Sequence, residues 1–500
     1  MVTSGGGPMA VGGPAPAEAG LLVYGLGRSG TAVLRRAASI GARVAFCEAR
    51  RDGEDVEEAL SLGATRVEDV SAVDPAAFPT CVAAPGVRID HPDLASLRSR
   101  GVSVIGEVEW TYLLVPGRYA GVTGTAGKGS TTLWLTAVLR ASGVDAVAGG
   151  NNDPALAAVA RPGATHVVEL SSFQLERCPT FRPDVAVALN LGEDHLDRHG
   201  SVAAYHRAKR ALIDNLTPRE TFVYNADDPL LRGWAEDTPA RTLAYSLHRE
   251  ADAHLGRDGT LRLFGAPLLP AGELAVKGEH QVGNALAVAL AAAALGLERE
   301  QVAAGLPTFA GLPGRYAEVA TAGGVTFVED SIATRPLAVT AALRASRRPL
   351  VWLAGGQAKG ADNSSLVPLV AERVDLLVAY GASGPDLARE FAPVTEVREC
   401  RQEDGREALE SAVRLAVDHL RERHGGGTVL LAPLAASFDQ FRDYAHRARV
   451  YREVVAAVVA ELEGGADGGA PGEDGGGAGS VGAGDAGAEG ASVSSARGRG

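Results

Sequence analysis

The residues with the most specific chemistry lie in the stretch Gly121 to Thr132, GVTGTAGKGSTT. An apolar run, residues 119–122, precedes it as a predicted strand, and residues 133–139 follow as a predicted helix. Gly124 and Gly127 allow the backbone to curl so that successive N–H groups point at one anion. Lys128 adds a cation that can reach terminal phosphates. The stretch therefore predicts a nucleotide-phosphate loop; the alternative is a glycine-rich turn with a chance lysine.

This stretch departs from the general phosphate-loop pattern at two positions. Val122 stands where the pattern opens with glycine. Gly129 follows the lysine, at the position where a Ser or Thr ordinarily binds Mg²⁺. Hydroxyl groups come one and two residues later, at Ser130 and Thr131. The loop thus predicts phosphate binding, and it leaves the metal ligand open between these hydroxyls and water.

Acidic and histidine side chains follow two further apolar runs. Glu169 lies near the end of the predicted strand 166–170, and His195 belongs to the sequence NLGEDHLD that follows the predicted strand 184–189. Ligands bind at the C-terminal ends of parallel strands, so these side chains could form a Mg²⁺ and phosphate shell. The alternative is a solvated acidic loop. Lys209, on a predicted helix over 202–212, would by itself be a surface charge.

A second glycine pattern, GLGRSG at residues 25–30, follows a predicted strand over 21–24 and precedes a predicted helix over 31–39. The next predicted strand, residues 43–47, ends in Glu48. This arrangement is typical of dinucleotide binding. Two other interpretations stay open at this point: a tight turn without a ligand, and a different nucleotide on the same turn.

Predicted strands and helices alternate along the chain, which indicates α/β domains with parallel sheets. A length of 500 residues suggests about three domains, and 46% apolar residues are ample for their cores. We expect domains over 20–115, 116–312 and 313–463, with a hinge near 311–315. The segments 1–19 and 464–500 are rich in small and polar residues, so we expect disordered tails.

Composition excludes several classes of protein. The net charge of −13 argues against a general nucleic-acid binder, and no apolar run is long enough to span a bilayer. The first 19 residues lack the basic region and the apolar stretch of a secretory signal. The four cysteines, Cys47, Cys81, Cys178 and Cys400, are scattered without metal-binding spacing. Reduced thiols in a cytoplasmic protein are the simplest account.

Taken together, eight motifs resemble those of the Mur ligase family of ATP-dependent amide ligases. They are GVTGTAGK, ELSSFQLE, NLGEDHLDR, AAYHRAK, NADD, GLPGR, DSIATRP and SFDQF, and they occur in the family's order. The resemblance extends from Gly25 to about Tyr451, nearly the whole folded chain. ELSSFQL is most similar to the family members that add D-glutamate.

The resemblance implies a three-domain fold: a Rossmann-like domain that binds the UDP of the substrate, a central ATPase-type domain, and a Rossmann-like domain for the incoming amino acid. ATP would phosphorylate the L-alanyl carboxylate of UDP-N-acetylmuramoyl-L-alanine, and the amine of D-glutamate would then displace phosphate. The expected cofactor is Mg²⁺, as two ions, with ATP as co-substrate. We expect a cytoplasmic monomer in peptidoglycan precursor synthesis, with neither nucleic acid nor membrane as a partner.

The resemblance also assigns roles to individual residues. Catalytic roles fall to Lys128, Glu169, His195 and Lys209, the last as a carbamylated lysine. The implied Mg²⁺ ligands are Glu169, His195, Lys209 and Ser130. The implied ATP contacts are Gly124, Thr125, Ala126, Gly127, Lys128, Gly129, Ser130, Thr131, Asn284, Arg315 and Asp330. The implied UDP-substrate contacts are Gly25, Leu26, Gly27, Arg28, Ser29, Glu48, Arg50, Pro85, Gly86 and Asn151. The implied D-glutamate contacts are Thr334, Lys359, Ser437 and Tyr444.

Three departures from the family pattern keep alternatives open. Ala126 stands where Asn is usual, Gly129 lacks the usual hydroxyl, and Ile332 replaces a lysine found in many members. One alternative is a sibling ligase that adds another amino acid or acts on folate. Another is a nucleotide-binding protein without ligase activity. A dehydrogenase is a third, supported only by the glycine pattern at residues 25–30.

Overall fold

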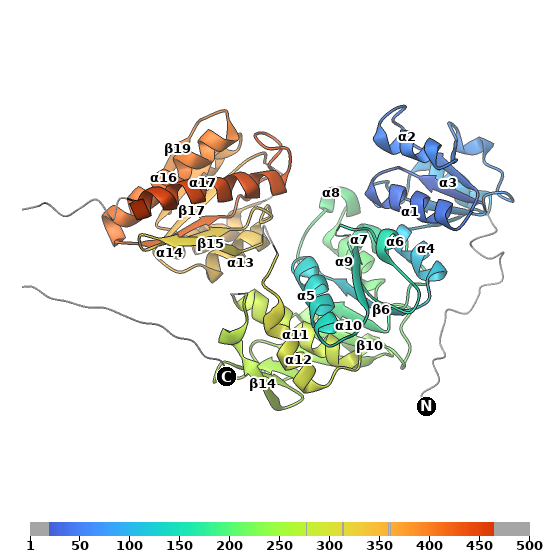
Figure 1. The fold of residues 1–500 in the computed structure, drawn as a ribbon, viewed down its shortest axis with the longest axis horizontal. Coiled ribbons are helices and arrows are strands. Elements are labelled where there is room, and N and C mark those ends of the chain that lie inside the picture. The colour runs from blue at the N-terminus through green and yellow to red at the C-terminus, as the bar shows by residue number, and fades with distance from the viewer. Residues whose placement is uncertain are drawn as a thin grey trace, which may run out of the picture.

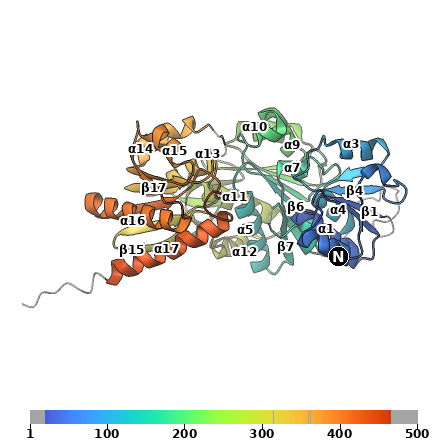
Figure 2. The same cartoon turned by 90° about the horizontal axis from the view of Figure 1, so that it is seen from above.

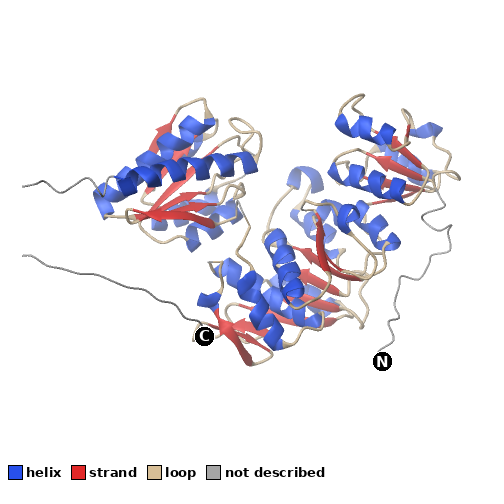
Figure 3. Ribbon diagram, viewed as in Figure 1, coloured by secondary structure: helices blue, strands red, loops and turns tan. Residues whose placement is uncertain are grey.

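The computed structural model describes residues 20–464 except 152, 277, 313, 314, 359 and 361. The expected tails lie outside the described residues, apart from Gly464. The described chain forms three α/β units, each built around its own sheet (Figure 1), with helices covering the strands (Figure 3). Seen from above, the three units follow one another along the long axis of the molecule (Figure 2). Within the described residues, every helix is too short or too polar to cross a membrane.

The first sheet is parallel throughout, as the sequence predicts, because each strand is connected to the next by a helix or a loop crossing over the sheet. Its order is β3-β2-β1-β4-β5, so the strand order reverses at β1, where ligands bind in such sheets. The strands are β1 (Leu21–Tyr24), β2 (Val44–Cys47), β3 (Thr65–Arg66), β4 (Thr80–Ala83) and β5 (Ser103–Ile105). The helices are α1 (Arg28–Ser39), α2 (Glu54–Ser61) and α3 (Pro92–Ser99).

Helix α4 (Glu107–Leu114) joins the first unit to the central one. Val108 and Tyr112 belong to the core of the central unit, whereas Trp110 packs in the core of the first. The Glu109 carboxylate accepts hydrogen bonds from the backbone N–H groups of Thr180 and Phe181. Helix α4 therefore attaches the first unit firmly to the central one.

The central sheet has the order β14-β13-β12-β11-β10-β9-β6-β8-β7. Strands β6 to β12 are parallel, and β13 and β14 add an antiparallel extension that the sequence reasoning did not anticipate. The strands are β6 (Arg118–Thr123), β7 (Ala146–Gly150), β8 (Thr165–Glu169), β9 (Val185–Ala188), β10 (Thr221–Asn225), β11 (Arg241–Ser246), β12 (Ala253–Leu255), β13 (Thr260–Leu263) and β14 (Ala266–Pro270). The helices are α5 (Lys128–Ala141), α6 (Leu156–Val159), α7 (Ser172–Leu175), α8 (Leu196–His199), α9 (Val202–Arg210), α10 (Pro229–Asp237), α11 (Glu279–Ala294) and α12 (Arg299–Gly305).

The third sheet has the order β15-β16-β20-β17-β18-β19, and β15 alone among these strands is antiparallel to its neighbour. The strands are β15 (Ala317–Ala322), β16 (Val325–Glu329), β17 (Leu350–Gly355), β18 (Leu376–Tyr380), β19 (Glu396–Cys400) and β20 (Gly427–Leu431). The helices are α13 (Pro336–Ala345), α14 (Val367–Arg373), α15 (Gly384–Phe391), α16 (Gly405–His424) and α17 (Tyr444–Gly464).

The last helix begins at Tyr444. The residues before it bond to neighbouring loops. The Asp439 carboxylate accepts a hydrogen bond from Ala382 N, and the Gln440 amide donates to the carbonyls of Gln402 and Glu403. These side-chain contacts hold residues 439 and 440 in a turn ahead of the helix.

Candidate active site

The phosphate loop lies between β6 and α5, at the C-terminal edge of the central sheet. Gly124 has φ 154° and Gly127 has φ 84°, a region that favours glycine. Asn190, which follows β9, fixes the loop: its carbonyl accepts from Thr125 N (2.9 Å) and its Oδ1 accepts from Ala126 N (2.8 Å). The open N-terminus of α5 behind the loop suits an anion.

Helix α11 contacts this loop through Asn284, one of the implied ATP contacts. A Cβ atom at Gly127 would lie 2.7 Å from Asn284 Oδ1, so the two residues are in close contact. The Asn284 amide is oriented by a neighbour on the same helix, because its Nδ2 donates to Gln281 Oε1 at 3.1 Å. Both side chains are buried.

Two lysine amines meet at one backbone oxygen of the loop. Lys128 Nζ donates to Gly124 O (2.9 Å) and Thr125 O (3.1 Å), and Lys209 Nζ donates to the same Gly124 O at 2.8 Å. Burial lowers the pKa of Lys128, with the charge of Arg315 adding to the shift and that of Glu169 opposing it. Burial and the neighbouring Lys128 charge lower the pKa of Lys209 well below its usual value. Lys209 is therefore an internal amine, not the surface charge that its helix suggested.

Tyr205 is a component of the site that the sequence reasoning missed. Its hydroxyl donates to Thr125 Oγ1 (3.3 Å), and Lys209 Nζ lies 4.7 Å from its ring centroid. The ring centroid lies 6.4 Å from that of His195. Burial raises the pKa of Tyr205 to about 12. The signal was available, because Tyr205 precedes Lys209 by four residues and so shares its helix face.

Glu169 ends β8 directly beside the phosphate loop. It pairs in register with Val122 of β6 and with Gly150 of β7. Its Oε1 accepts from Asn151 Nδ2 at 2.9 Å, and its Oε2 is buried without a hydrogen-bond partner among the described residues. Thr131 Oγ1 is a second buried oxygen of this kind, and Ser130 is also buried.

His195 is the N-cap residue of α8. Its backbone is left-handed, with φ 53°, and its N–H donates to Asp194 Oδ1 at 2.9 Å. Its ring centroid lies 4.7 Å from that of Phe173. The described residues contain no group of three or more His, Cys, Asp or Glu side chains that could hold a metal ion.

The implied UDP-binding residues gather at the C-terminal end of β1. Glu48 organises them: its Oε2 accepts from Leu26 N (2.7 Å) and its Oε1 accepts from Arg50 N (3.1 Å). Gly25 has φ 90°, and a Cβ at Gly30 would lie 2.0 Å from Gly25 O, so this turn requires glycine at both positions. Helix α1 starts after Gly27 without a side-chain cap, with Ser29 in its first turn.

Four other implied UDP-substrate residues lie at the border with the central unit. Arg28 Nη2 donates to Asn151 O at 3.0 Å, which joins two of the implied contacts. Pro85 and Gly86 lie in the turn after β4, and Gly86 O accepts a hydrogen bond from Arg198 of the central unit. These bonds place Arg28, Asn151 and Gly86 at the border between the two units.

In the third unit, Asp330 follows β16 and is buried. Burial raises its pKa to about 8, with Glu329 adding to the shift and Arg315 opposing it. The charge of Arg315 thus acts on both Asp330 and Lys128, which places it between the phosphate loop and the third sheet. Ser437 is buried, Tyr444 is half exposed, and Thr334 lies in the loop after β16. Lys359 lies outside the described residues.

One ion pair joins the third unit to the loop that carries His195. Arg335 Nη2 lies 3.2 Å from Asp194 Oδ1. Close by, a Cβ at Gly192 would lie 3.3 Å from Leu337 of α13 and 3.5 Å from Thr125. The start of α13 therefore contacts the central unit beside the phosphate loop.

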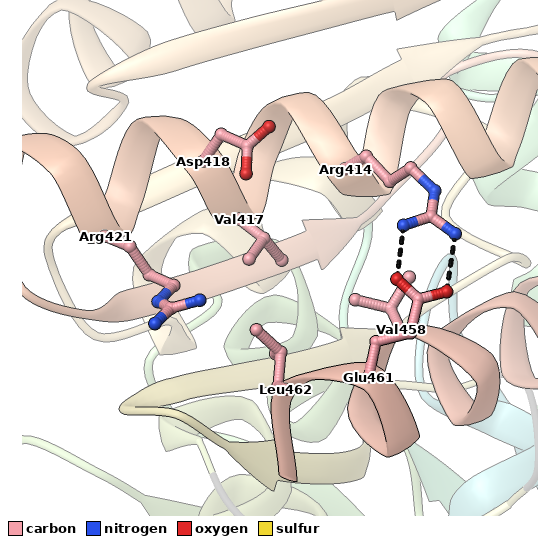
Figure 4. Close-up of a pocket in the computed structure, with 7 residues that line it drawn as sticks. All are labelled: Arg414, Val417, Asp418, Arg421, Val458, Glu461 and Leu462. Carbon is pink, nitrogen blue, oxygen red and sulfur yellow. Dashed lines mark hydrogen bonds and ion pairs between the residues drawn. The ribbon is translucent and has the colours of Figure 1, made fainter. Parts of the chain in front are cut away.

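A surface pocket of about 480 Å³ lies elsewhere, between α16 and α17 (Figure 4). Arg414 and Glu461 form a bidentate ion pair across it, with N–O distances of 2.6 and 2.8 Å. Its lining residues are Arg414, Val417, Asp418, Arg421, Val458, Glu461 and Leu462. None of the implied site residues lines this pocket, so it is separate from the candidate active site.

Comparisons with known proteins agree with this arrangement. The family model described as Mur ligase middle domain matches residues 122–292, and that described as Mur ligase, glutamate ligase domain matches residues 314–433. A UDP-N-acetylmuramoylalanine–D-glutamate ligase from Thermus thermophilus is 45% identical over 446 residues, 88% of this chain and 98% of its own. The ligase of the same name from Deinococcus radiodurans is 41% identical, covering 89% and 94%.

Solved structures support the same fold. The MurF ligase from Thermotoga maritima in complex with ADP superposes with a TM-score of 0.56, covering 90% of this chain and 99% of its own at 18% identity. At 18% identity, this match shows similarity of fold alone. The two ligases from Thermus and Deinococcus are similar in sequence as well, at 45% and 41% identity. The chain belongs to the Mur ligase family.

Proposed function

We propose that this chain is an ATP-dependent ligase that joins D-glutamate to UDP-N-acetylmuramoyl-L-alanine and releases ADP and phosphate. The observation that carries the proposal is the 45% identity to a ligase of that name, over 98% of the relative's length. The phosphate loop, the paired lysines and the acid at the end of β8 supply the groups that such a reaction needs. The reaction belongs to cytoplasmic peptidoglycan precursor synthesis, and we expect the enzyme to act as a monomer.

The chemistry explains why ATP is required. A carboxylate oxygen is a poor leaving group, so the L-alanyl carboxylate first attacks the γ-phosphorus of ATP and displaces ADP. The neutral amine of D-glutamate then attacks the acyl carbon, and the tetrahedral intermediate collapses to an amide as phosphate leaves with the former carboxylate oxygen. The protein contributes positioning and charge neutralisation. The backbone N–H groups of Gly124–Thr131 and the Lys128 ammonium would surround the phosphates.

Lys209 is best explained as a carbamate. Its buried amine has a pKa well below the usual value, because of burial and because Lys128 lies nearby. A neutral amine is the form that adds to CO₂. The resulting carbamate would carry a negative charge beside Lys128, and it would offer oxygen atoms toward the phosphate loop. This modification would relieve the burial of two like charges at Gly124 O.

The residues around the loop fit Mg²⁺, although they do not enclose it alone. Mg²⁺ prefers oxygen ligands and keeps several waters. Glu169 Oε2 and Thr131 Oγ1 are buried oxygens without partners among the described residues, and a Lys209 carbamate and Ser130 would add others. His195 would complete the set from the far side. When bound, Mg²⁺ would neutralise charge on the phosphoryl group; we expect two such ions.

Each unit would bind one substrate. Residues 20–115 would hold the UDP moiety at the Gly25–Ser29 turn, with Glu48, Arg50, Pro85, Gly86 and Asn151 around it. Residues 116–312 would hold ATP, with Asn284 at the loop and Arg315 and Asp330 reaching in from the third unit. Residues 313–463 would hold D-glutamate through Thr334, Lys359, Ser437 and Tyr444, because hydroxyl donors and a cation suit a dicarboxylate.

The test is ADP formation by the purified protein. We expect turnover only when UDP-N-acetylmuramoyl-L-alanine, D-glutamate and Mg²⁺ are all present. A panel of L-glutamate, L-lysine and meso-diaminopimelate should give little or no ADP. Equal turnover with L-lysine would assign the chain to a sibling reaction. Tight ATP binding without any turnover would support a nucleotide-binding protein that is not a ligase.

A further inference from the structure

The border between the first and central units contains an arginine that bridges three groups. Arg198, on α8 of the central unit, donates from Nη1 to Gly86 O (3.2 Å) and from Nη2 to Val87 O (2.9 Å) in the first unit. Nη2 also donates to Glu176 Oε2 at 3.2 Å. The Arg198 side chain is only 9% exposed, and its bonds to Val87 O and Glu176 are partly buried, whereas the bond to Gly86 O lies at the surface.

The same arginine anchors the short helix that presents His195. Helix α8 has four residues, too few to be stable without tertiary contacts. The Arg198 guanidinium lies 4.7 Å from the ring centroid of Phe173, and that ring lies 4.7 Å from His195. Through these contacts, Arg198 connects the turn after β4 with the residue that faces the phosphate loop.

Glu176 is itself held in place by a second chain of contacts. His199 Nδ1 lies 3.2 Å from Glu176 Oε1, and His199 Nε2 lies 3.0 Å from Ser172 Oγ. The His199 side chain is only 2% exposed. Ser172 and Glu176 belong to the segment directly after Glu169. Glu176, which accepts a hydrogen bond from Arg198, is therefore held close in sequence to Glu169, the proposed catalytic acid at the end of β8.

A second arginine supports the same turn. Arg177 is only 1% exposed, and its Nη2 donates to Val87 O. Its backbone carbonyl accepts from Gly106 N at 2.8 Å, ahead of α4. Val87 O thus accepts from two guanidinium groups of the central unit, which fixes this turn more tightly than a typical surface loop.

We propose that Arg198 is a positioning residue that holds the Gly86–Val87 turn and the His195 helix in one fixed arrangement, so that substrate bound at the first unit meets the phosphate loop. The proposal rests on the ligase function above for its catalytic part. The structural part, coupling of the two segments, stands apart from it. A planar guanidinium reaches two carbonyls and a carboxylate together, whereas a lysine ammonium cannot reproduce that fork.

The test compares Arg198→Met and Arg198→Lys with Arg182→Met. Arg182 is a matched control, since it is an arginine of the central unit that forms an ion pair, with Glu220 at 3.5 Å, and is 45% exposed. Hydrogen exchange is measured for the backbone segments 84–91 and 192–199 without substrates. We expect exchange in both segments to rise about tenfold together in Arg198→Met. The exchange rates of Arg182→Met should match those of wild type. The rates of Arg198→Lys should lie between those of wild type and Arg198→Met.

Kinetics provide the second measurement. In Arg198→Met we expect kcat to fall about ten- to hundredfold, while KM for ATP stays within about twofold of wild type. Faster exchange in segment 192–199 alone, or an unchanged kcat, would overturn the proposal. If wild type fails to form ADP, the ligase assignment falls, and the exchange data still decide whether Arg198 couples the two segments.

Discussion

Lys209 is the residue at which burial and charge conflict most directly. The residue is 1% exposed, its amine shares Gly124 O with Lys128, and its pKa lies well below the usual value because of burial and that neighbouring charge. A protonated amine here would be a second buried cation beside the first. The proposed carbamate would change the sign of the charge and would account for a lysine at this position.

Lys209→Ala should therefore lose most activity, because an oxygen ligand disappears and the phosphates are less well neutralised. Acetate should restore part of the rate by placing an oxygen anion in the vacated space. The measurement is ADP formation with and without acetate. Arg210→Ala, at a half-buried neighbour on α9 that forms ion pairs with Asp214 and Asp237, is the control and should keep wild-type activity. Full activity in Lys209→Ala would return this residue to a structural role and weaken the assignments of Glu169 and His195.

Asp330 gives a pH-dependent prediction. Its pKa of about 8 lies above the ordinary value of about 4, chiefly because of burial. Between those values the folded protein holds a proton that the unfolded chain has released, so Asp330 lowers stability as pH rises through that window. Asp330→Asn removes this effect. The melting temperature of the variant, relative to that of wild type, should therefore increase as the pH rises from about 5 to about 8. Asp52→Asn, in an exposed loop, is the control, and its melting temperature should differ from that of wild type by the same amount at every pH. If the difference for Asp330→Asn were also independent of pH, the raised pKa of Asp330 would be contradicted.

At the scale of elements, the phosphate loop depends on the left-handed conformation of Gly127. Its φ is 84°, and an added Cβ would meet Asn284 Oδ1 at 2.7 Å. Gly127→Ala should therefore weaken ATP binding at least about tenfold, through strain and displacement of Asn284. Calorimetric titration with ATP measures this. Gly143→Ala is the control, because Gly143 has φ 80° and open space at the other end of α5. It should lower stability and leave ATP affinity unchanged.

Sequence patterns predicted the strands that build the site more reliably than the contacts within it. Strand β1 occupies the predicted residues 21–24, and β8 overlaps the predicted strand over 166–170. Helix α5 begins five residues before the predicted start, because Gly127 serves as its N-cap and the polar residues 128–132 form its first turns. The extension β13–β14 was missed, since its short segments lack a long apolar run.

Contacts between segments that are distant in the sequence were the hardest feature to predict. Lys209 could be assigned to an internal site only through the resemblance, because its helix carries a polar face that is typical of surface helices. The bonds from Arg198 to Gly86 and Val87 join residues more than a hundred positions apart. Nothing in the local pattern around either segment indicates the other, so these contacts required the three-dimensional structure.

At the scale of the whole molecule, the central unit is joined differently to its two neighbours. Four arginine side chains donate to backbone carbonyls across its border with the first unit, namely Arg28, Arg36, Arg177 and Arg198. Toward the third unit, the Asp194–Arg335 ion pair lies beside the phosphate loop, and its side chains are 17% and 36% exposed. Salt screens partly exposed ion pairs, so a rise in ionic strength weakens this contact. We expect the third unit to be the one that moves.

Arg335→Met should test this expectation by small-angle scattering. Without ligands, the radius of gyration of wild type should increase between about 0.05 and 0.5 M salt, as screening weakens the pair. Arg335→Met should already have the larger radius of gyration at the lowest salt concentration, and that radius should change little as salt is added. Arg344→Met, an exposed position near the end of α13, should behave like wild type. Equal salt responses in all three proteins would show that the ion pair does not hold the third unit.

The central claim is that ATP activates the L-alanyl carboxylate, and oxygen transfer tests it most directly. The substrate UDP-N-acetylmuramoyl-L-alanine is prepared with ¹⁸O in both carboxylate oxygens and is incubated with ATP, Mg²⁺ and D-glutamate. If an acyl phosphate forms, one labelled oxygen must leave with each phosphate, and mass spectrometry of the released phosphate should find a single ¹⁸O per molecule. Phosphate that carries no label while the amide product accumulates would contradict the account.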